Sequence, residues 1–301
     1  MASFGYQVLG FGAGGSAAGI EVDYLVIAGG GGGGGANAAG GGAGGMRFSA
    51  YGPAPLNSDV KSIIEAGTAY TVTVGGGGNA GVYPGTPSTK GSDSTFNDIT
   101  SSGGGTSDAP PLWVGGSGSN GSGWCAYVGA AGNTPPTSPP QGNPGGTSSN
   151  VASPGTAGSG GGGGAGQAGY TGGSMNPNGG KGGDGVAINI SGSSVTLAGG
   201  GGSGNDNRGY SSAVGAAGAG GGGGGNGGNG TANTGGGAGG GGFPTPNGGA
   251  GGSGYVQVRV PADVAPLISV APGTNTFTTV PAPQGGGSLA TFTVSGTLTV
   301  A

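Results

Sequence analysis

The chain lacks the side chains that most enzymes use. Among its 301 residues it has no histidine and one cysteine, Cys125, and charged residues make up only 5%. Histidine is the side chain that ordinarily titrates near neutral pH, so its absence disfavours acid–base catalysis. The lone cysteine excludes an internal disulfide, and neither neighbour of Cys125 is a base that would activate its thiol. We therefore expect no enzymatic activity and no cofactor.

Basic clusters and long apolar runs are also missing. The six Lys and Arg residues are scattered along the chain, whereas phosphate binding needs them clustered. No stretch approaches the ~18 apolar residues of a membrane span, and the amino terminus lacks the basic and continuous apolar regions of a secretory signal. Residues 179–187 match one copy of a calcium-binding nonapeptide that acts in stacked tandem copies. We expect no nucleic-acid binding, no membrane insertion, no export signal and no metal site.

Glycine is the abundant residue: 91 of the 301 residues are glycine, about 30% of the chain, whereas an average protein has ~7%. Unbroken runs such as residues 29–35 exclude the Gly-X-Y repeat of collagen. A flexible linker is the alternative for such a composition. Disordered segments, however, are rich in charge and poor in aromatics, whereas this chain has little charge and nine Tyr, seven Phe and two Trp. These features favour an ordered chain.

A short strand-like segment followed by a glycine run recurs along the sequence. Each segment is β-branched or aromatic, has four to eight residues and is bounded by turn formers, which is typical of a strand. Tyr70, Val72 and Val74 alternate with threonines, which predicts a strand with one buried face. The clearest segments and the runs after them are residues 21–28 before 29–35, 70–74 before 75–78, 95–100 before 103–105, and 194–198 before 199–202.

Ordered glycine runs have few regular conformations open to them. Glycine is unfavourable in an α-helix by ~1 kcal/mol relative to alanine, and it packs no side chain in a sheet. The extended threefold helix remains, and only glycine lets such helices approach closely on every side. The predicted fold class is mainly β and non-regular: a bundle of polyglycine II helices flanked by short β-strands, with almost no α-helix. Residues 58–66 are the only helix we expect.

The composition divides the chain into three parts. Residues 1–19 hold several aromatics among Gly and Ala and are expected to form an attachment arm, with a buried first strand as the alternative. Residues 20–260 form the glycine-rich domain, which ends in an alternating strand at 255–260 and includes a long Pro/Ser/Gly-rich loop at 103–158. Residues 261–301 form a carboxyl-terminal β segment with strands at 276–280 and a strand–turn–strand pattern at 288–300.

Four landmarks resemble the glycine-rich domain of bacteriophage tail-fibre and adhesin proteins. They are VDYLVIAG at 22–29, YTVTVG at 70–75, GSDSTF at 91–96 and GYVQV at 254–258. The amino-terminal FGYQVLGFG at 4–12 also resembles the opening of marine-phage virion proteins. The resemblance implies a polyglycine-helix bundle whose variable loops contact the host surface. It further implies a homo-oligomeric virion protein that is made in the host cytoplasm and binds a host glycan or outer-membrane protein.

One alternative function is a capsid decoration or fibre protein without receptor binding; an extracellular coat or ice-binding bundle is another.

For an adhesin, aromatic side chains in irregular segments are the best contact candidates, because aromatic faces stack on sugars and dominate interface energetics. Packing against glycine helices is the other interpretation of each one. The candidates are Trp113, Trp124, Tyr127, Tyr83, Tyr170 and Tyr210.

The chain departs from the family pattern at its carboxyl terminus. In relatives a TFTxSGTFTV segment precedes the first strand of the glycine-rich domain, whereas here its counterpart lies at residues 291–300. We predict that this segment pairs with residues 22–28, within the chain or on a neighbouring subunit. Other virion proteins would then join through the amino-terminal arm or this carboxyl-terminal strand.

Overall fold

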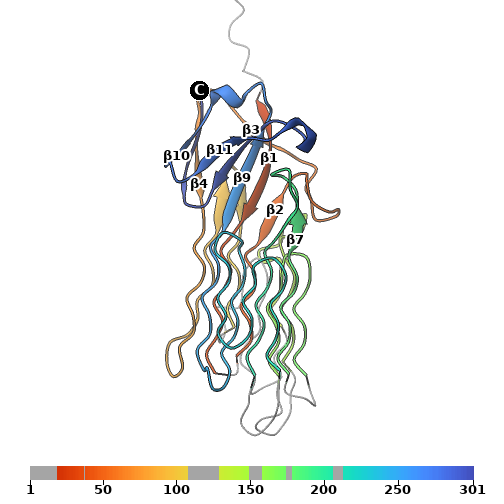
Figure 1. The fold of residues 1–301 in the computed structure, drawn as a ribbon, viewed down its shortest axis with the longest axis vertical. Coiled ribbons are helices and arrows are strands. Elements are labelled where there is room, and N and C mark those ends of the chain that lie inside the picture. Colours follow the sequence, from red (N-terminus) through yellow and green to blue (C-terminus); the bar gives the residue numbers. More distant parts are fainter. Residues whose placement is uncertain (1–18, 37, 108–128, 149–157, 174–177, 206–212) are drawn as a thin grey trace, which may run out of the picture.

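An elongated molecule with a β-sheet head and a long glycine-rich bundle is seen in the computed structural model (Figure 1). The structure describes residues 19–36, 38–107, 129–148, 158–173, 178–205 and 213–301. The head comprises residues 19–27, 46–73, 94–101, 186–197 and 255–301, and the other described residues form the bundle. We call the end of the bundle farthest from the head the distal end.

The head is built from short antiparallel strands and two 3-10 turns, and the described residues include no α-helix. The strands are β1 Ile20–Ile27, β2 Met46–Phe48, β3 Ser62–Ile64, β4 Ala69–Thr73, β5 Ser94–Phe96, β6 Ile99–Ser101, β7 Val186–Ile188, β8 Val195–Leu197, β9 Tyr255–Val260, β10 Ile268–Ala271, β11 Thr276–Thr279, β12 Ser288–Phe292 and β13 Gly296–Val300. The 3-10 turns are η1 Ala265–Leu267 and η2 Ala282–Gln284.

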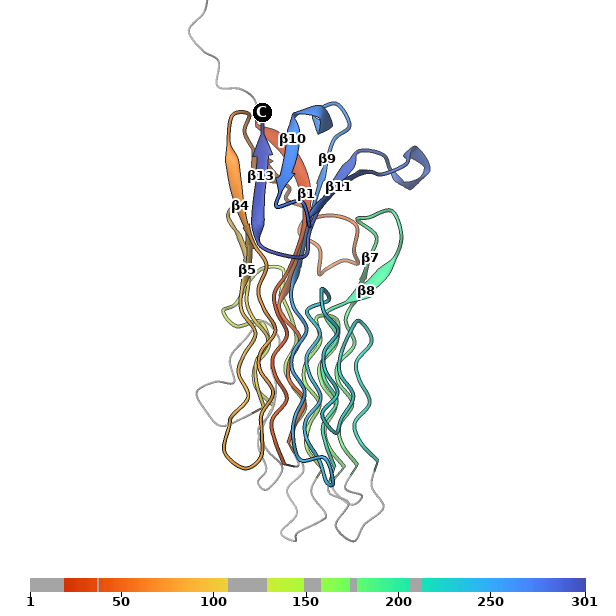
Figure 2. The ribbon, with the colours of Figure 1, turned by 60° about the vertical axis from the view of Figure 1, so that its left-hand side comes forward.

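Three layers make up the head. A six-stranded sheet has the order β11-β12-β9-β1-β2, with β3 also pairing with β1, and a five-stranded sheet has the order β10-β13-β4-β5-β6. The hairpin β7–β8 forms the third layer. In Figure 2 the six-stranded sheet lies between the five-stranded sheet and this hairpin. All pairings among these strands are antiparallel.

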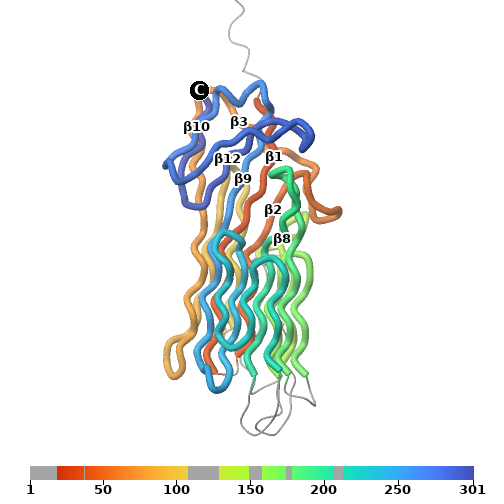
Figure 3. The backbone as a smooth tube through the Cα atoms, in the orientation of Figure 1, coloured from red at the N-terminus to blue at the C-terminus, as the bar shows by residue number. Residues whose placement is uncertain are grey.

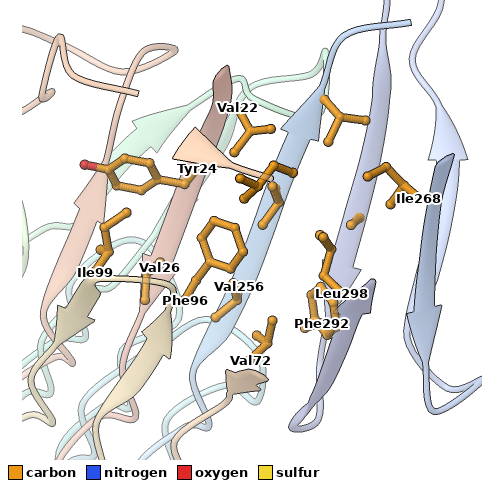
Figure 4. Packing of buried hydrophobic residues seen from close by; sticks show 14 of the residues in the cluster. Val22, Tyr24, Val26, Val72, Phe96, Ile99, Val256, Ile268, Phe292 and Leu298 are labelled. Carbon is orange, nitrogen blue, oxygen red and sulfur yellow. The ribbon is translucent and has the colours of Figure 1, made fainter. Parts of the chain in front are cut away.

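The second half of strand β1 is buried on both faces, which explains its continuous apolar sequence from Tyr24 to Ile27. Its residues Val22, Tyr24 and Val26 face the five-stranded sheet, in a core shared with residues such as Phe96 and Leu298 (Figure 4). Its residues Leu25 and Ile27 belong to the second core, which includes buried residues of the β7–β8 hairpin. Successive side chains of a strand point to opposite faces, so one strand supplies both cores.

Most of the expected strands are confirmed. β1, β4, β8, β9, β11 and the β12–β13 hairpin lie where the β-branched and aromatic segments of the sequence predict strands. The segment at 95–100 is not one strand but two, β5 and β6, with Asn97 at positive φ in the turn between them. β2, β3, β7 and β10 are absent from the sequence-based prediction, because three or four residues are too few to show a period.

The helix expected at residues 58–66 is wrong. This stretch contains β3, which pairs antiparallel with the start of β1 through Ile20↔Ile64 and Val22↔Ser62. Ser62 and Ile64 are buried whereas Ile63 is exposed, which is the period of a strand. The β-branched isoleucines favour this pairing over a helix that would have little apolar surface to pack against.

The pairing expected between residues 291–300 and 22–28 is also wrong within the chain. β9 lies between them: Phe292 pairs with Val256, which in turn pairs with Val26. Leu298 belongs to β13 in the other sheet, where it pairs with Tyr70. Phe292, Leu298 and Val26 nevertheless share one hydrophobic core. The apolar pattern therefore indicates the correct core but not the neighbouring strand.

In the bundle the glycine-rich segments run side by side between the head and the distal end (Figure 3). The segment at residues 28–34 continues directly from β1 and donates hydrogen bonds in three directions. Its N–H groups at Gly29 and Gly32 donate to carbonyls of residues 92 and 89, those at Gly30 and Gly33 to residues 252 and 249, and those at Ala28 and Gly31 to residues 45 and 42. Donors three residues apart therefore reach the same neighbouring segment.

Carbonyl groups of the same segment accept hydrogen bonds from three further neighbours. Gly30 and Gly33 accept from residues 78 and 81, Gly31 accepts from residue 238 and Gly34 from 241, and Gly29 accepts from residue 104. The segment is therefore bonded to six neighbours through its main chain alone. Residues 199–204 have the same arrangement: they donate to residues 220–223, 180–183 and 38–41 and accept from 162, 237–240 and 215–218.

Close approach of these segments leaves no room for a side chain at Gly31. A Cβ atom there would overlap the carbonyl oxygen of Gly105, well inside the 3.0 Å that real Cβ atoms keep, whereas one at Gly76 would meet no atom within 4 Å. We expect Gly31→Ala to lower the free energy of unfolding by about 3 kcal/mol or more, because buried main chain must move apart. Denaturant unfolding followed by circular dichroism measures this.

Gly76→Ala is the matched control, because it makes the same substitution in an adjoining segment at an exposed position. It should change the free energy of unfolding by less than about 1 kcal/mol, and towards greater stability, since alanine restricts the unfolded chain. Equal effects of the two substitutions would contradict the close packing around Gly31.

Candidate functional site

Two of the six aromatic candidates fall within the described residues. Tyr83 lies in a turn at the distal end of the bundle, and Tyr170 lies in a bundle segment. The tyrosines are 54% and 45% exposed, so neither is buried among glycine segments. Trp113, Trp124, Tyr127 and Tyr210 lie outside the described residues, and their assignment stays a prediction.

Tyr83 belongs to a pair of neighbouring turns, residues 79–89 and 242–248, which we call the distal turns; both lie at the foot of the bundle in Figure 1. Val82 and Thr86 exchange two main-chain hydrogen bonds of 2.8 and 3.0 Å, which closes the first turn tightly. The Tyr83 N–H donates to Asn247 Oδ1 at 3.1 Å and so joins the two turns. The tyrosine ring is thus presented to solvent from a fixed backbone.

Tyr170 lies in a charged environment. Lys181 Nζ is 5.7 Å from the centre of its ring, and the Gln167 side-chain amide donates to its hydroxyl at 2.8 Å. Lys181 also forms an ion pair of 2.8 Å with Asp184. The hydrogen bond from Lys181, aided by one from the Ala219 N–H, holds the pKa of the Asp184 carboxyl below its ordinary value. Tyr170 and Tyr83 have no partner in common, so the structure does not bring them into one site.

Comparison with known proteins is consistent with the glycine pattern. Residues 8–261 match the family described as a glycine-rich domain. The chain belongs to this family. Comparisons with curated proteins and with solved structures give no match. Family membership of this glycine-rich domain therefore rests on the extent of the match, which covers most of the chain.

The head of this glycine-rich domain contains a polar cavity of about 370 Å³. Arg259, which is only 4% exposed, lines it and donates to the carbonyls of Ile190, Gln284 and Gly286, while its guanidinium lies 4.7 Å from the centre of the Tyr51 ring. These carbonyl contacts use the guanidinium to tie β9 to the β7–β8 and β11–β12 connections. The sequence does not single out Arg259, because an isolated arginine in an alternating strand carries no distinguishing pattern.

Acidic residues also line this cavity without forming a metal site. Glu21 lies 3.7 Å from Lys61, and Asp23 accepts a 2.8 Å hydrogen bond from the Ser49 hydroxyl. In the described part of the chain, no group of three or more His, Cys, Asp and Glu residues has an arrangement that would hold a metal ion. Among the same residues, no helix has the length and apolar character needed to cross a membrane.

The ion pair of Lys181 and Asp184 has a predictable pH dependence. A carboxyl whose pKa is lowered on folding stabilises the fold above its unfolded pKa and loses that contribution as the pH falls through the folded value. Both side chains are more than one-third exposed, so we expect Asp184→Asn to lower the free energy of unfolding at pH 7 by less than about 1 kcal/mol. Urea unfolding at pH 7 and at a series of pH values down to about 2 measures the effect, because the contribution declines below the ordinary carboxyl pKa and is lost as the pH falls through the lowered folded value.

The difference between wild type and Asp184→Asn should vanish at the lower pH. Lys181→Met is the companion variant, and the double variant should lose no more than either single one if the pair acts as a unit. A difference that stays constant with pH would show that the charge of Asp184 is not its stabilising feature.

Proposed function

We propose that this glycine-rich domain is a bacteriophage virion protein, a tail-fibre adhesin that contacts the host cell through the distal end of its bundle. In this proposal the bundle segments are polyglycine II helices that form a rigid spacer. The head joins the other virion proteins, and the distal turns face a glycan or an outer-membrane protein of the host. The protein is made in the host cytoplasm, acts in the particle as a homo-oligomer and has no enzymatic activity.

The observation that carries the proposal is the three-residue period of the main-chain hydrogen bonds. Polyglycine II has three residues per turn and no internal hydrogen bonds, so each N–H and C=O is free to bond with a neighbour. Residues three apart on the segment 28–34 donate to the same neighbour, and the six neighbours surround it. A β-strand has a period of two and bonds in one plane only. This pattern supports polyglycine II helices and hence the resemblance to phage adhesins.

Contact with the host through the distal turns is supported by their exposed side chains. Tyr83 and Val82 are about half exposed on a backbone fixed by Asn247, whereas the segments behind them present mostly glycine. Tyrosine on a fixed backbone adds contact area at a low cost in side-chain entropy. Tyr170 supplies a second exposed ring on another segment. Trp113, Trp124, Tyr127 and Tyr210 remain proposed contact residues on the strength of the sequence.

Attachment to other virion proteins is proposed at the head, through the arm at residues 1–19 or through a free sheet edge. Both sides of β12 and of β13 are already paired within the chain, so neither is open to a strand from another subunit. β11 is the edge strand next to β12 in the six-stranded sheet, and β10 is the edge strand next to β13 in the five-stranded sheet. An added strand would satisfy the unpaired main-chain groups there.

Amide hydrogen exchange tests the polyglycine II assignment. Gly31 and Gly32 donate to residues 42 and 89, whereas the exposed Gly76 N–H donates to no group in the residues that the structure describes. We expect Gly31 and Gly32 to exchange at least ~10³-fold more slowly than Gly76, because their exchange requires the bundle to open. Residue-resolved exchange by NMR measures this, with Gly76 as the internal control. Equal, fast exchange at all three glycines would indicate a flexible tether.

Binding of the purified, labelled chain to the phage's host bacteria tests the adhesin proposal. We expect Tyr83→Ala to weaken cell binding roughly tenfold, as for a moderate interface hot spot. Val60→Ala is the control: it truncates an exposed apolar side chain in the head and should leave binding unchanged. Trp113→Ala and Trp124→Ala extend the test to the predicted loop residues.

The outcome that would favour the structural alternative is equally specific. If wild type binds no host cells and particles lacking the protein fail to assemble or lose a capsid decoration, the protein is a decoration or fibre component without receptor binding. An antibody label on intact particles, viewed by electron microscopy, distinguishes a tail from a head position.

A further inference from the structure

A second cavity, of about 350 Å³, lies in the head between the β7–β8 hairpin and β9; we call it the hairpin cavity. It is separate from the polar cavity around Arg259 and from the distal turns. Its volume is in the range of small-molecule sites. Its lining includes Ile188, Ile190, Val195, Leu197, Tyr255 and Gln257.

The walls of the hairpin cavity carry no charge and are apolar on the side of the hairpin, whereas the other lining residues are polar. Ile188, Ile190, Val195 and Leu197 come from the hairpin and its connection, and the lining includes no Lys, Arg, Asp or Glu. An ion that entered would lose its hydration without gaining an opposite charge, which is unfavourable. Apolar groups gain free energy by leaving water for such a surface. The cavity therefore selects a neutral, mostly apolar molecule.

Polar specificity comes from Gln257, which projects from β9 and is only 5% exposed. Its side-chain N–H groups donate to the Tyr255 hydroxyl at 2.8 Å and to the Thr291 hydroxyl at 3.3 Å. Its carbonyl oxygen accepts no hydrogen bond from any residue that the structure describes, although this amide lines the cavity. The oxygen stays open to the cavity, so a hydrogen-bond donor on a bound molecule can take the place of water there.

The Tyr255 hydroxyl holds the Gln257 amide in place. It accepts a hydrogen bond from Gln257 and also forms a hydrogen bond with the Thr291 side chain. Burial raises the pKa of Tyr255, against a smaller lowering by the hydrogen bond with Thr291. A hydroxyl group on a ligand would complement the Gln257 oxygen, because it can donate a hydrogen bond to it.

We propose that the hairpin cavity is a binding site for a small neutral alcohol or phenol, with its apolar body against the hairpin and its hydroxyl on Gln257. The site does not depend on the adhesin proposal, because it lies in the head and uses none of the aromatic candidates. The ligand is held between the β7–β8 hairpin and the six-stranded sheet, so binding also restrains the hairpin against the sheet.

Titration of the full chain with p-cresol tests this site. Binding is detected through the methyl NMR signals of Ile188, Val195 and Leu197. We expect p-cresol to shift these methyl signals in a saturable way. Toluene, which lacks only the hydroxyl, should bind about tenfold more weakly, and the charged 4-hydroxybenzoate should bind more weakly still. These comparisons use the wild-type protein, so they do not depend on the folding of a variant.

The Val195→Trp variant is designed to block the hairpin cavity. Val195 is 47% exposed at the cavity, so the larger side chain can fill the space without disturbing a core, and p-cresol binding should be lost. Val294→Trp makes the same change on the exposed β12–β13 turn and should keep wild-type affinity. The proposal is overturned if p-cresol shifts none of the methyl signals, if toluene binds as tightly, or if Val195→Trp retains p-cresol binding.

Discussion

Main-chain hydrogen bonding between glycine segments is the interaction on which the rest of the structure depends. Each net hydrogen bond contributes only ~0.5–1.5 kcal/mol, which is similar to the ~1–2 kcal/mol that ordering one backbone residue costs. A bundle of this kind is stable only if nearly every N–H and C=O finds a partner. The segment at 28–34 meets this requirement with six neighbours. A single Cβ at a position such as Gly31 would separate several of these partners at once.

The head provides the apolar burial that the bundle lacks. β1 enters the bundle directly, and its side chains are divided between two cores on opposite faces of one sheet. β9 follows directly from a bundle segment and pairs antiparallel with residues 23–27 of β1. The strands therefore set the relative positions of the segments that leave them, and burial of Val22, Phe292 and Leu298 stabilises this starting register. Head and bundle therefore share a continuous main chain and a common register.

Much of the strand pattern could be predicted from the sequence, because alternation at residues such as Tyr70 and Val72 reports a local property. Partner choice could not. Phe292 was expected beside β1 and lies beside β9, since both strands are apolar and both present a face to the same core. The stretch at 58–66 shows the same limit: its helix signals were local, whereas pairing with Ile20 decided its structure. Of the candidate site, exposure of Tyr83 followed from its turn, but its link to Asn247 required the fold.

The three-residue repeat of the bonding pattern has a consequence for how this scaffold can change in length. In the polyglycine II geometry proposed above, inserting one residue into a segment turns every following donor by about 120°, so that each faces a different neighbour. Inserting three residues restores all directions and lengthens the segment by about 9 Å. In that geometry we expect the rod to lengthen in triplets shared by adjacent segments, whereas the turns that join the segments are not bound by this period. The scaffold thus combines segments whose length changes in steps of three residues with turns whose composition can change one residue at a time.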